Sequence, residues 1–433
     1  MKFFLAAFFL LFVGSVEAQT VIHGTVTDGN GRSPVSGQAH FGNYNDNMKQ
    51  SESYACAADG SYSFTVDKPG MYLLRFSAVD HEEASVPIII QSGDKNIELD
   101  ARLKPNPFNG TYDRVTIIGD WNKFEFAGPD TMVPTTKNDK TIFTYTRQAT
   151  GDTLSYQLLG VAGSHSVNGT NADYYSYDGG GDYRSVLRTK PGQDVTITFD
   201  PSKWNYEPNE DLPEISVKND PFLEQAVALS MKADEMYNEA RVLPEHGGPI
   251  TVSPEKYKEM LDYIRKAVED ANARGEKQLA EYGAVTLAGE YLPSGSFSAD
   301  AALLVLHTVP ATSTFWAMKP MDANSLLDLV DTGFAEHYRK EMEKNPERLV
   351  QAYAYANEMS HAFDRHEDKL GNELYAKLKA DYSDVSQIKY QLTAYDPDAP
   401  TRLGKHVPPF EVTLLNSSHK VSDKTMLGRY YMI

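Results

Sequence analysis

The chain has 433 residues and an acidic balance, with 60 Asp and Glu against 41 Lys and Arg and a net charge of −19. This balance argues against nucleic acid as a partner, because phosphate binding needs clustered Lys and Arg, and it disfavours an anionic membrane surface for the same reason. A hydrophobic content of 41% is enough for folded cores, and the length predicts two to four domains.

The first 18 residues have the pattern of a secretory signal peptide. Lys2 precedes a short apolar run, and Val16 and Ala18 are small residues at the −3 and −1 positions of a cleavage site. The apolar run is too short to span a bilayer. We therefore expect cleavage after Ala18 and an exported protein of the periplasm or cell envelope, with no membrane span after cleavage.

Residues 20–104 predict a β-sandwich, because short alternating segments are separated by Gly, Pro and Asp turns. The segments 24–28 (Gly-Thr-Val-Thr-Asp) and 59–64 (Asp-Gly-Ser-Tyr-Ser-Phe) resemble carboxypeptidase regulatory-like domains. That resemblance implies a non-catalytic spacer. Cys56, the single cysteine of the chain, cannot form an internal disulfide, and we expect a buried structural thiol.

Residues 111–204 predict a second sandwich, immunoglobulin-like or starch-binding-like, with strands near 114–122, 141–147, 153–159, 185–189 and 194–200. The first of these resembles the opening strand of starch- and glycogen-binding sandwiches. Aromatic rings stack on the apolar faces of sugars. The candidate glycan-binding residues are Trp121, Tyr174, Tyr175 and Trp204. The simpler interpretation, which we favour from sequence alone, makes Trp121 a core residue and 174–183 a loop packed on its own sandwich.

No catalytic residue, metal site or cofactor is expected. Asp173, Asp178 and Asp182 have the oxygen ligands that calcium takes, but their spacing fits no calcium loop. His361 and His366 are five residues apart, so on a helix they point about 140° away from each other and are badly placed to share a metal.

Residues 219–384 predict an antiparallel bundle of seven or eight helices. Apolar residues recur at helical spacing from Phe222 onward, and Ser253 followed by Pro254 is a strong helix start. Beyond the bundle, 387–395 alternates and predicts a strand, and 396–400 predicts a rigid linker.

Residues 401–433 predict the start of a further domain. Gly404, Pro408 and Phe410, followed by the segment 427–433, resemble the opening of redoxin domains, which are thioredoxin-like α/β thiol–disulfide oxidoreductases of bacterial envelopes. The resemblance implies a hairpin, a strand and then a catalytic dithiol, which this chain lacks. An ordinary C-terminal hairpin is the alternative.

These features predict a multidomain protein with two all-β sandwiches, an α-helical bundle and the first strands of a thioredoxin-like domain. The first functional hypothesis is a member of the thiol–disulfide oxidoreductase family, truncated before its dithiol and inactive as given. The alternative is a non-catalytic envelope protein that binds a glycan or a protein partner through its sandwiches.

Overall fold

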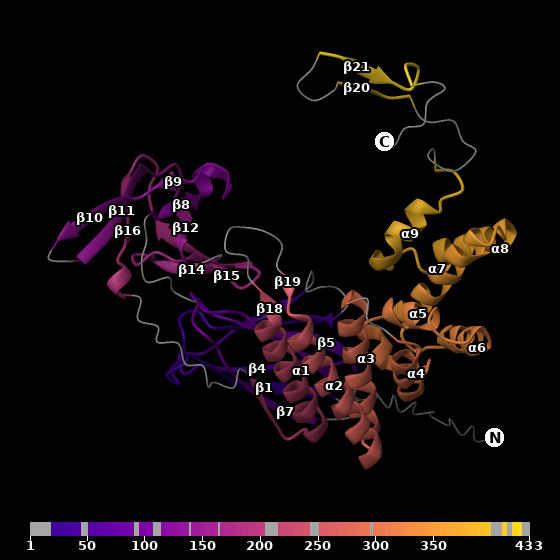
Figure 1. Cartoon of the computed structure of the whole chain (residues 1–433). Helices are drawn as coiled ribbons and strands as arrows, with labels where there is room; N and C mark the ends of the chain where they lie inside the picture. The colour runs from indigo at the N-terminus through magenta and orange to yellow at the C-terminus, as the bar shows by residue number, and fades with distance from the viewer. Residues whose placement is uncertain are drawn as a thin grey trace, which may run out of the picture. The chain divides into compact units, whose positions relative to one another are not determined.

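The computed structural model describes residues 19–44, 51–90, 95–106, 114–137, 140–162, 165–203, 215–242, 251–294, 298–399, 409–413 and 418–426. The chain forms two compact units, Met1–Tyr257 and Lys258–Ile433 (Figure 1). The predicted signal peptide and Trp204 lie outside the described residues.

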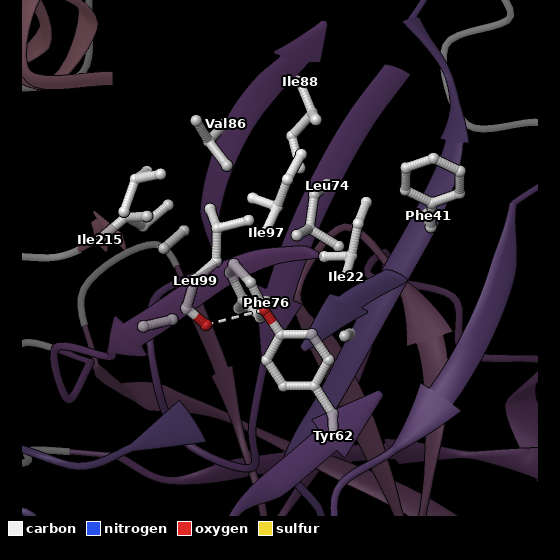
Figure 2. Close-up of a cluster of buried hydrophobic side chains, with 14 of the residues drawn as sticks. Ile22, Phe41, Tyr62, Leu74, Phe76, Val86, Ile88, Ile97, Leu99 and Ile215 are labelled. Atoms are coloured by element: carbon white, nitrogen blue, oxygen red, sulfur yellow. Dashed lines mark hydrogen bonds between the residues drawn. The ribbon is translucent and has the colours of Figure 1, made fainter. Parts of the chain in front are cut away.

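The first sandwich consists of two sheets with strand orders β17-β7-β1-β4 and β3-β2-β5-β6. Side chains from both sheets meet in one core, where the hydroxyl of Tyr62 donates a 2.8 Å hydrogen bond to the carbonyl oxygen of Leu99 (Figure 2). Gly24 is required in this core, because a Cβ there would lie 1.6 Å from that same oxygen. The strands that precede the second sandwich are β1 (Thr20–Thr27), β2 (Gln38–Asn43), β3 (Glu52–Ala55), β4 (Ser61–Val66), β5 (Gly70–Ser77), β6 (Ala84–Ile90) and β7 (Lys95–Arg102).

Cys56 is half-buried, and not fully buried as expected, and it packs against the core of the first sandwich. Burial raises its pKa to about 11. The thiolate, which is the reactive form, is therefore scarce at neutral pH.

Strand β17 (Ile215–Lys218) returns to the first sandwich after the second one is complete. It pairs antiparallel with β7, with Ile215 opposite Ala101. The first sandwich was expected to end at residue 104, whereas in the structure the second sandwich is an insertion between two neighbouring strands of the first.

The second sandwich pairs a three-stranded sheet, β10-β11-β16, with a sheet of order β14-β15-β12-β8-β9, to which β13 is added beside β12. The region expected as a loop, 174–183, is instead a hairpin of β14 and β15, whose turn has positive φ at Gly179, Gly180 and Gly181. Tyrosines favour strands and glycines favour such turns, so the residues themselves explain the difference. The strands are β8 (Thr116–Gly119), β9 (Asp130–Thr131), β10 (Val133–Lys137), β11 (Lys140–Gln148), β12 (Thr153–Ala162), β13 (His165–Val167), β14 (Tyr174–Gly179), β15 (Asp182–Arg188) and β16 (Asp194–Phe199).

Helix α1 (Pro221–Ala240) packs on the first sandwich, although its residues lie within the predicted helical bundle. Asp220 caps its N-terminus by accepting a hydrogen bond from Leu223 N, and the side chains of Leu223 and Val227 join the sandwich core. The short strands β18 (Arg241–Val242) and β19 (Thr251–Val252) then pair with each other.

The described residues between 254 and 381 are mostly helical, in keeping with the predicted helical region. The strand predicted at 387–395 is wrong, because most of this segment forms the helix α9. Ile388, Leu392 and Tyr395 are spaced by four and three residues, which places them on one helical face against a shared core. The helices are α2 (Pro254–Arg274), α3 (Lys277–Ser294), α4 (Ala299–Thr308), α5 (Asp322–Leu327), α6 (Thr332–Met342), α7 (Arg348–Asp364), α8 (Asp368–Asp381) and α9 (Lys389–Ala394).

Within the described ranges, no helix combines the length and the apolar character needed to cross a membrane. Near the C-terminus, β20 (Glu411–Thr413) pairs antiparallel with β21 (Lys420–Ser422), which confirms the predicted hairpin. The strand expected within 429–433 lies outside the described residues.

Candidate carbohydrate-binding face

The outer face of the sheet β14-β15-β12-β8 carries a set of polar and aromatic side chains. Residues of β12 and β15 such as Tyr156 and Leu187 point into the core of the second sandwich, so the residues between them point away from it. The register of β14 with β15 and of β8 with β12 places outward-pointing residues of all four strands on the same side of the sheet. We call the exposed and half-exposed members of this set the arginine–tyrosine face: Tyr174, Ser176 and Asp178 of β14, with Arg184 and Arg188 of β15. The other outward-pointing residues, Val186, Gln157 and Ile118, are buried.

The loop after β8 extends this face. Its Asp120 accepts a 2.7 Å hydrogen bond from Ser155 N, which ties the start of the loop to β12. Lys123 and Phe124 both adopt left-handed backbone conformations, with φ of 56° and 58°. Two consecutive non-glycine residues in that region are uncommon and indicate a loop held in a required shape. The loop carries the ring of Phe124 to 4.1 Å from the guanidinium of Arg184.

Phe126, two residues further along the same loop, is 71% exposed. Exposed aromatic rings on a fixed loop are typical of recognition surfaces. The loop therefore also carries an uncovered ring, two residues beyond the one that contacts Arg184.

Hydrogen bonds fix the polar side chains of the face. Asp178 Oδ2 accepts from Arg184 Nε at 3.1 Å and from Gln157 Nε2 at 3.3 Å. The guanidinium of Arg188 lies 5.6 Å from the ring centroid of Tyr174, which is 41% exposed. Arg184 and Arg188 are four residues apart on one strand, so these two arginine–aromatic pairs are about 13 Å apart.

Trp121 does not lie on the arginine–tyrosine face. Its Nε1 donates a 2.8 Å hydrogen bond to Asp130 Oδ2, the ring of Tyr145 stacks on it, and the guanidinium of Arg147 lies 4.1 Å from its centroid. The indole also packs against the core of the second sandwich. This geometry places Trp121 at the edge of the core, with its nitrogen already bonded.

Among the four residues predicted from sequence, Tyr174 is the one that the described structure places on the face. Tyr175 points to the opposite side of β14, and its hydroxyl lies 3.4 Å from the carbonyl oxygen of Gly169. Sequence reasoning missed Phe124, Phe126 and the two arginines. The period-two alternation of 182–188, read as a strand, would have placed both arginines on one face.

The aspartates considered for calcium have other partners. Asp173 Oδ2 accepts a 2.6 Å hydrogen bond from Arg188 N, and Asp178 pairs with Arg184. In the part of the chain that the structure describes, no group of three or more metal-ligating side chains gathers in a way that could hold an ion.

A buried chain of hydrogen bonds joins the two sandwiches. His40 Nδ1 lies 2.8 Å from Ser53 Oγ, and His40 Nε2 lies 2.7 Å from Ser77 Oγ. Ser77 Oγ in turn lies 2.7 Å from the hydroxyl of Tyr183 on β15. The ring of Tyr177 stacks on His40 with a centroid separation of 4.1 Å. The back of the β14–β15 hairpin is therefore bonded to the first sandwich while its front carries the arginine–tyrosine face.

No family model matches the chain, and no curated protein matches it. One similar solved structure is a protein from Bacteroides uniformis ATCC 8492 with a proposed carbohydrate-binding role, at 8% identity and a TM-score of 0.16, covering 42% of this chain and 80% of that one. Another is a DUF3823 family protein from Parabacteroides merdae ATCC 43184, at 11% identity and a TM-score of 0.18, covering 42% and 81%. TM-scores this low establish no shared fold, and the residues of the chain itself must indicate its function.

Proposed function

We propose that this chain is an exported, non-catalytic binding protein that holds a carbohydrate on the arginine–tyrosine face. The observation that carries the proposal is the exposed ring of Tyr174 beside Arg188 on the sheet, together with the exposed ring of Phe126 on the loop that brings Phe124 to Arg184. Tyr174 and Phe126 offer apolar surface to the C–H faces of sugar rings, and Arg188 offers donors to their hydroxyls. Asp178 neutralises Arg184, so Arg188 is the cation that the face offers to a ligand.

The test is retention of the mature chain, from residue 19, in affinity gels containing α-glucans and on an array of other glycans. We expect Tyr174→Ala and Phe126→Ala each to weaken retention several-fold, and the double variant to abolish it. Val133→Ala is the matched control, because Val133 is 61% exposed on the other sheet of the same sandwich. If no glycan retains the wild type, or if the double variant is retained equally, the proposal is wrong and a protein partner takes its place.

Thiol–disulfide exchange is a second candidate, which rests on the resemblance of residues 401–433 to the opening of redoxin domains. The residues of this chain contain a single cysteine, and exchange by this family needs two. We therefore expect the chain not to reduce insulin. A reading frame that continues past residue 433 into a Trp-Cys-x-x-Cys motif would support the family assignment, and one that continues without it would remove this candidate.

A further inference from the structure

A cavity of about 230 Å³ lies between the first sandwich and the C-terminal half of α1. Helix α1 lines it with residues from Met231 to Asn238, and the sandwich lines it with residues at the start of β6, the end of β7 and the start of β17. Pockets for drug-sized ligands have volumes of roughly 300–1,000 Å³. The cavity therefore has room for one small molecule and not for a polymer.

The side of α1 that packs on the sandwich changes character where it reaches the cavity. In the first half of the helix, Leu223 and Val227 join the sandwich core, and Met231 packs against it. The same stripe, continued at helical spacing, places Asp234 and Asn238 at the cavity. A stripe that served packing alone would stay apolar, so its polar end indicates a space that receives polar atoms.

Arg102 brings a positive charge to the cavity from the end of β7, and its side chain is half-buried. Two carboxylates, Glu98 and Asp100, precede it on the same outward row of the strand. Both are already bound by Lys218, at 2.6 Å and 2.9 Å. Within the described residues, the guanidinium of Arg102 has neither an ion pair nor a hydrogen bond. A partly desolvated guanidinium without a counter-ion favours a carboxylate from a ligand.

The cavity also contains negative charges, which restrict the kind of anion. Glu82 lies beside Lys104, since Glu82 N donates a 2.8 Å hydrogen bond to the carbonyl oxygen of Lys104, and α1 adds Asp234. Glu83 is already paired with Arg75 at 3.2 Å. These carboxylates repel a dianion such as phosphate and attract an ammonium group. A molecule with one carboxylate and one ammonium group matches both signs.

The rest of the lining is apolar or aromatic. Ala84, Ile215 and Met231 line the cavity from the sandwich and from α1. The ring of Tyr237 is 38% exposed and packs edge-on against Tyr257, with 6.1 Å between the ring centroids. An occupant with an apolar or aromatic side chain would cover this surface.

We propose that the cavity between α1 and the first sandwich binds a zwitterionic amino acid with an apolar or aromatic side chain. Arg102 donates hydrogen bonds to its carboxylate, and Asp234 accepts from its ammonium group. Tyr237 contacts its side chain. This site belongs to the first sandwich and does not depend on the arginine–tyrosine face of the second.

The experiment is isothermal titration calorimetry of the mature chain with L-leucine and L-phenylalanine. Two analogues of phenylalanine, 3-phenylpropionate and phenethylamine, each lack one of the two charged groups. We expect saturable binding of at least one amino acid. Each analogue should bind about tenfold more weakly than L-phenylalanine, because it leaves one charge of the cavity unmatched.

Substitutions test the two charged residues against matched controls. Arg102→Gln should weaken amino acid binding about tenfold. Arg32→Gln is its control, because Arg32 is an exposed arginine of the same sandwich that does not line the cavity. Asp234→Asn should weaken binding several-fold. Glu235→Gln is the control for it, because Glu235 is the next residue of α1 and lies outside the cavity lining.

The analogues separate direct contact from a structural role of Arg102. If Arg102 holds the carboxylate, Arg102→Gln should bring the affinities for L-phenylalanine and phenethylamine close together and leave the ratio between L-phenylalanine and 3-phenylpropionate unchanged. An equal loss for all three compounds would contradict the proposed contact. Should Arg102→Gln fail to fold, Asp234→Asn at an exposed helix position provides the reciprocal test with 3-phenylpropionate.

Absence of saturable binding for both amino acids would overturn the proposal. Binding of 3-phenylpropionate as tight as that of L-phenylalanine would also overturn it, because the site would then recognise an anion alone. The Tyr174→Ala, Phe126→Ala double variant should keep its amino acid binding, so failure of the carbohydrate-binding proposal and failure of this one are distinguishable.

Discussion

At the scale of single residues, His40 shows how burial sets a proton equilibrium. Burial, with a smaller contribution from the Arg75 charge, lowers the pKa of His40 to about 4. The unfolded chain, with an ordinary histidine pKa near 6.5, therefore binds more protons than the folded chain between pH 6.5 and 4. The stability that neutral His40 contributes is complete above pH 6.5 and is lost as pH falls toward 4.

Replacing His40 by Gln should make this dependence visible. The difference in unfolding free energy between wild type and His40→Gln should shrink by about 3 kcal/mol from pH 7 to pH 4, because the glutamine side chain at position 40 does not titrate. Urea unfolding at several pH values measures it. A difference that stays constant with pH would contradict a depressed pKa at His40.

Asp80 should behave in the opposite sense. Burial, reinforced by the charge of Asp182, raises its pKa to about 7 even though Asn168 N donates it a 3.0 Å hydrogen bond. Stability from this group is present below its unfolded pKa, near 3.9, and is lost as pH rises through 7.

Asp80→Asn should therefore gain melting temperature relative to wild type at pH 8 and gain little at pH 4. The amide oxygen can still accept from Asn168 N, and Asn tolerates the left-handed φ of 60° found there. Thermal unfolding at the two pH values tests it. An equal shift at both would show that Asp80 is ionised throughout.

At the scale of elements, β17 is the strand whose place no local pattern revealed. Ile215 and Val217 are both 6% exposed in the core of the first sandwich, but only pairing with β7 explains their burial. Ile215→Ala should lower the unfolding free energy by about 2–5 kcal/mol, because it removes buried apolar surface and leaves a cavity. Ser216→Ala, at the exposed position between them, is the control and should change it little. Equal urea midpoints for both variants would place β17 outside the sheet.

The contrast between local patterns and long-range contacts explains which parts of the fold the sequence could predict. Helices with caps and apolar stripes, such as α1 and α2, and strands with period-two patterns, such as β4, follow from local residues. Segment 387–395 fits both an alternating and a helical pattern, and packing against α7 and α8 selected the helix. On the arginine–tyrosine face, Tyr174 was predictable as an aromatic candidate, whereas the contact between Phe124 and Arg184 depends on a loop reaching from β8 to β15.

At the scale of the whole molecule, the inserted second sandwich makes the architecture separable. It has its own core, distinct from the core of the first sandwich. The chain leaves the first sandwich after β7 and re-enters it at β17, which are adjacent antiparallel strands. A domain inserted between neighbouring strands can be removed without cutting either core, because surface connections tolerate such changes.

We therefore expect a chain with residues 107–214 replaced by a short Gly-Ser linker to fold, and residues 107–214 alone to fold as well. The shortened chain should be less stable than the parent, because it loses the bond between Ser77 and Tyr183 and the stacking of Tyr177 on His40. Dispersed NMR spectra and cooperative unfolding test both pieces. Glycan retention should go with residues 107–214, because they contain the arginine–tyrosine face. Glycan retention by the shortened chain would place the carbohydrate site in the first sandwich or the helical unit. If neither piece folds, the two sandwiches fold only together.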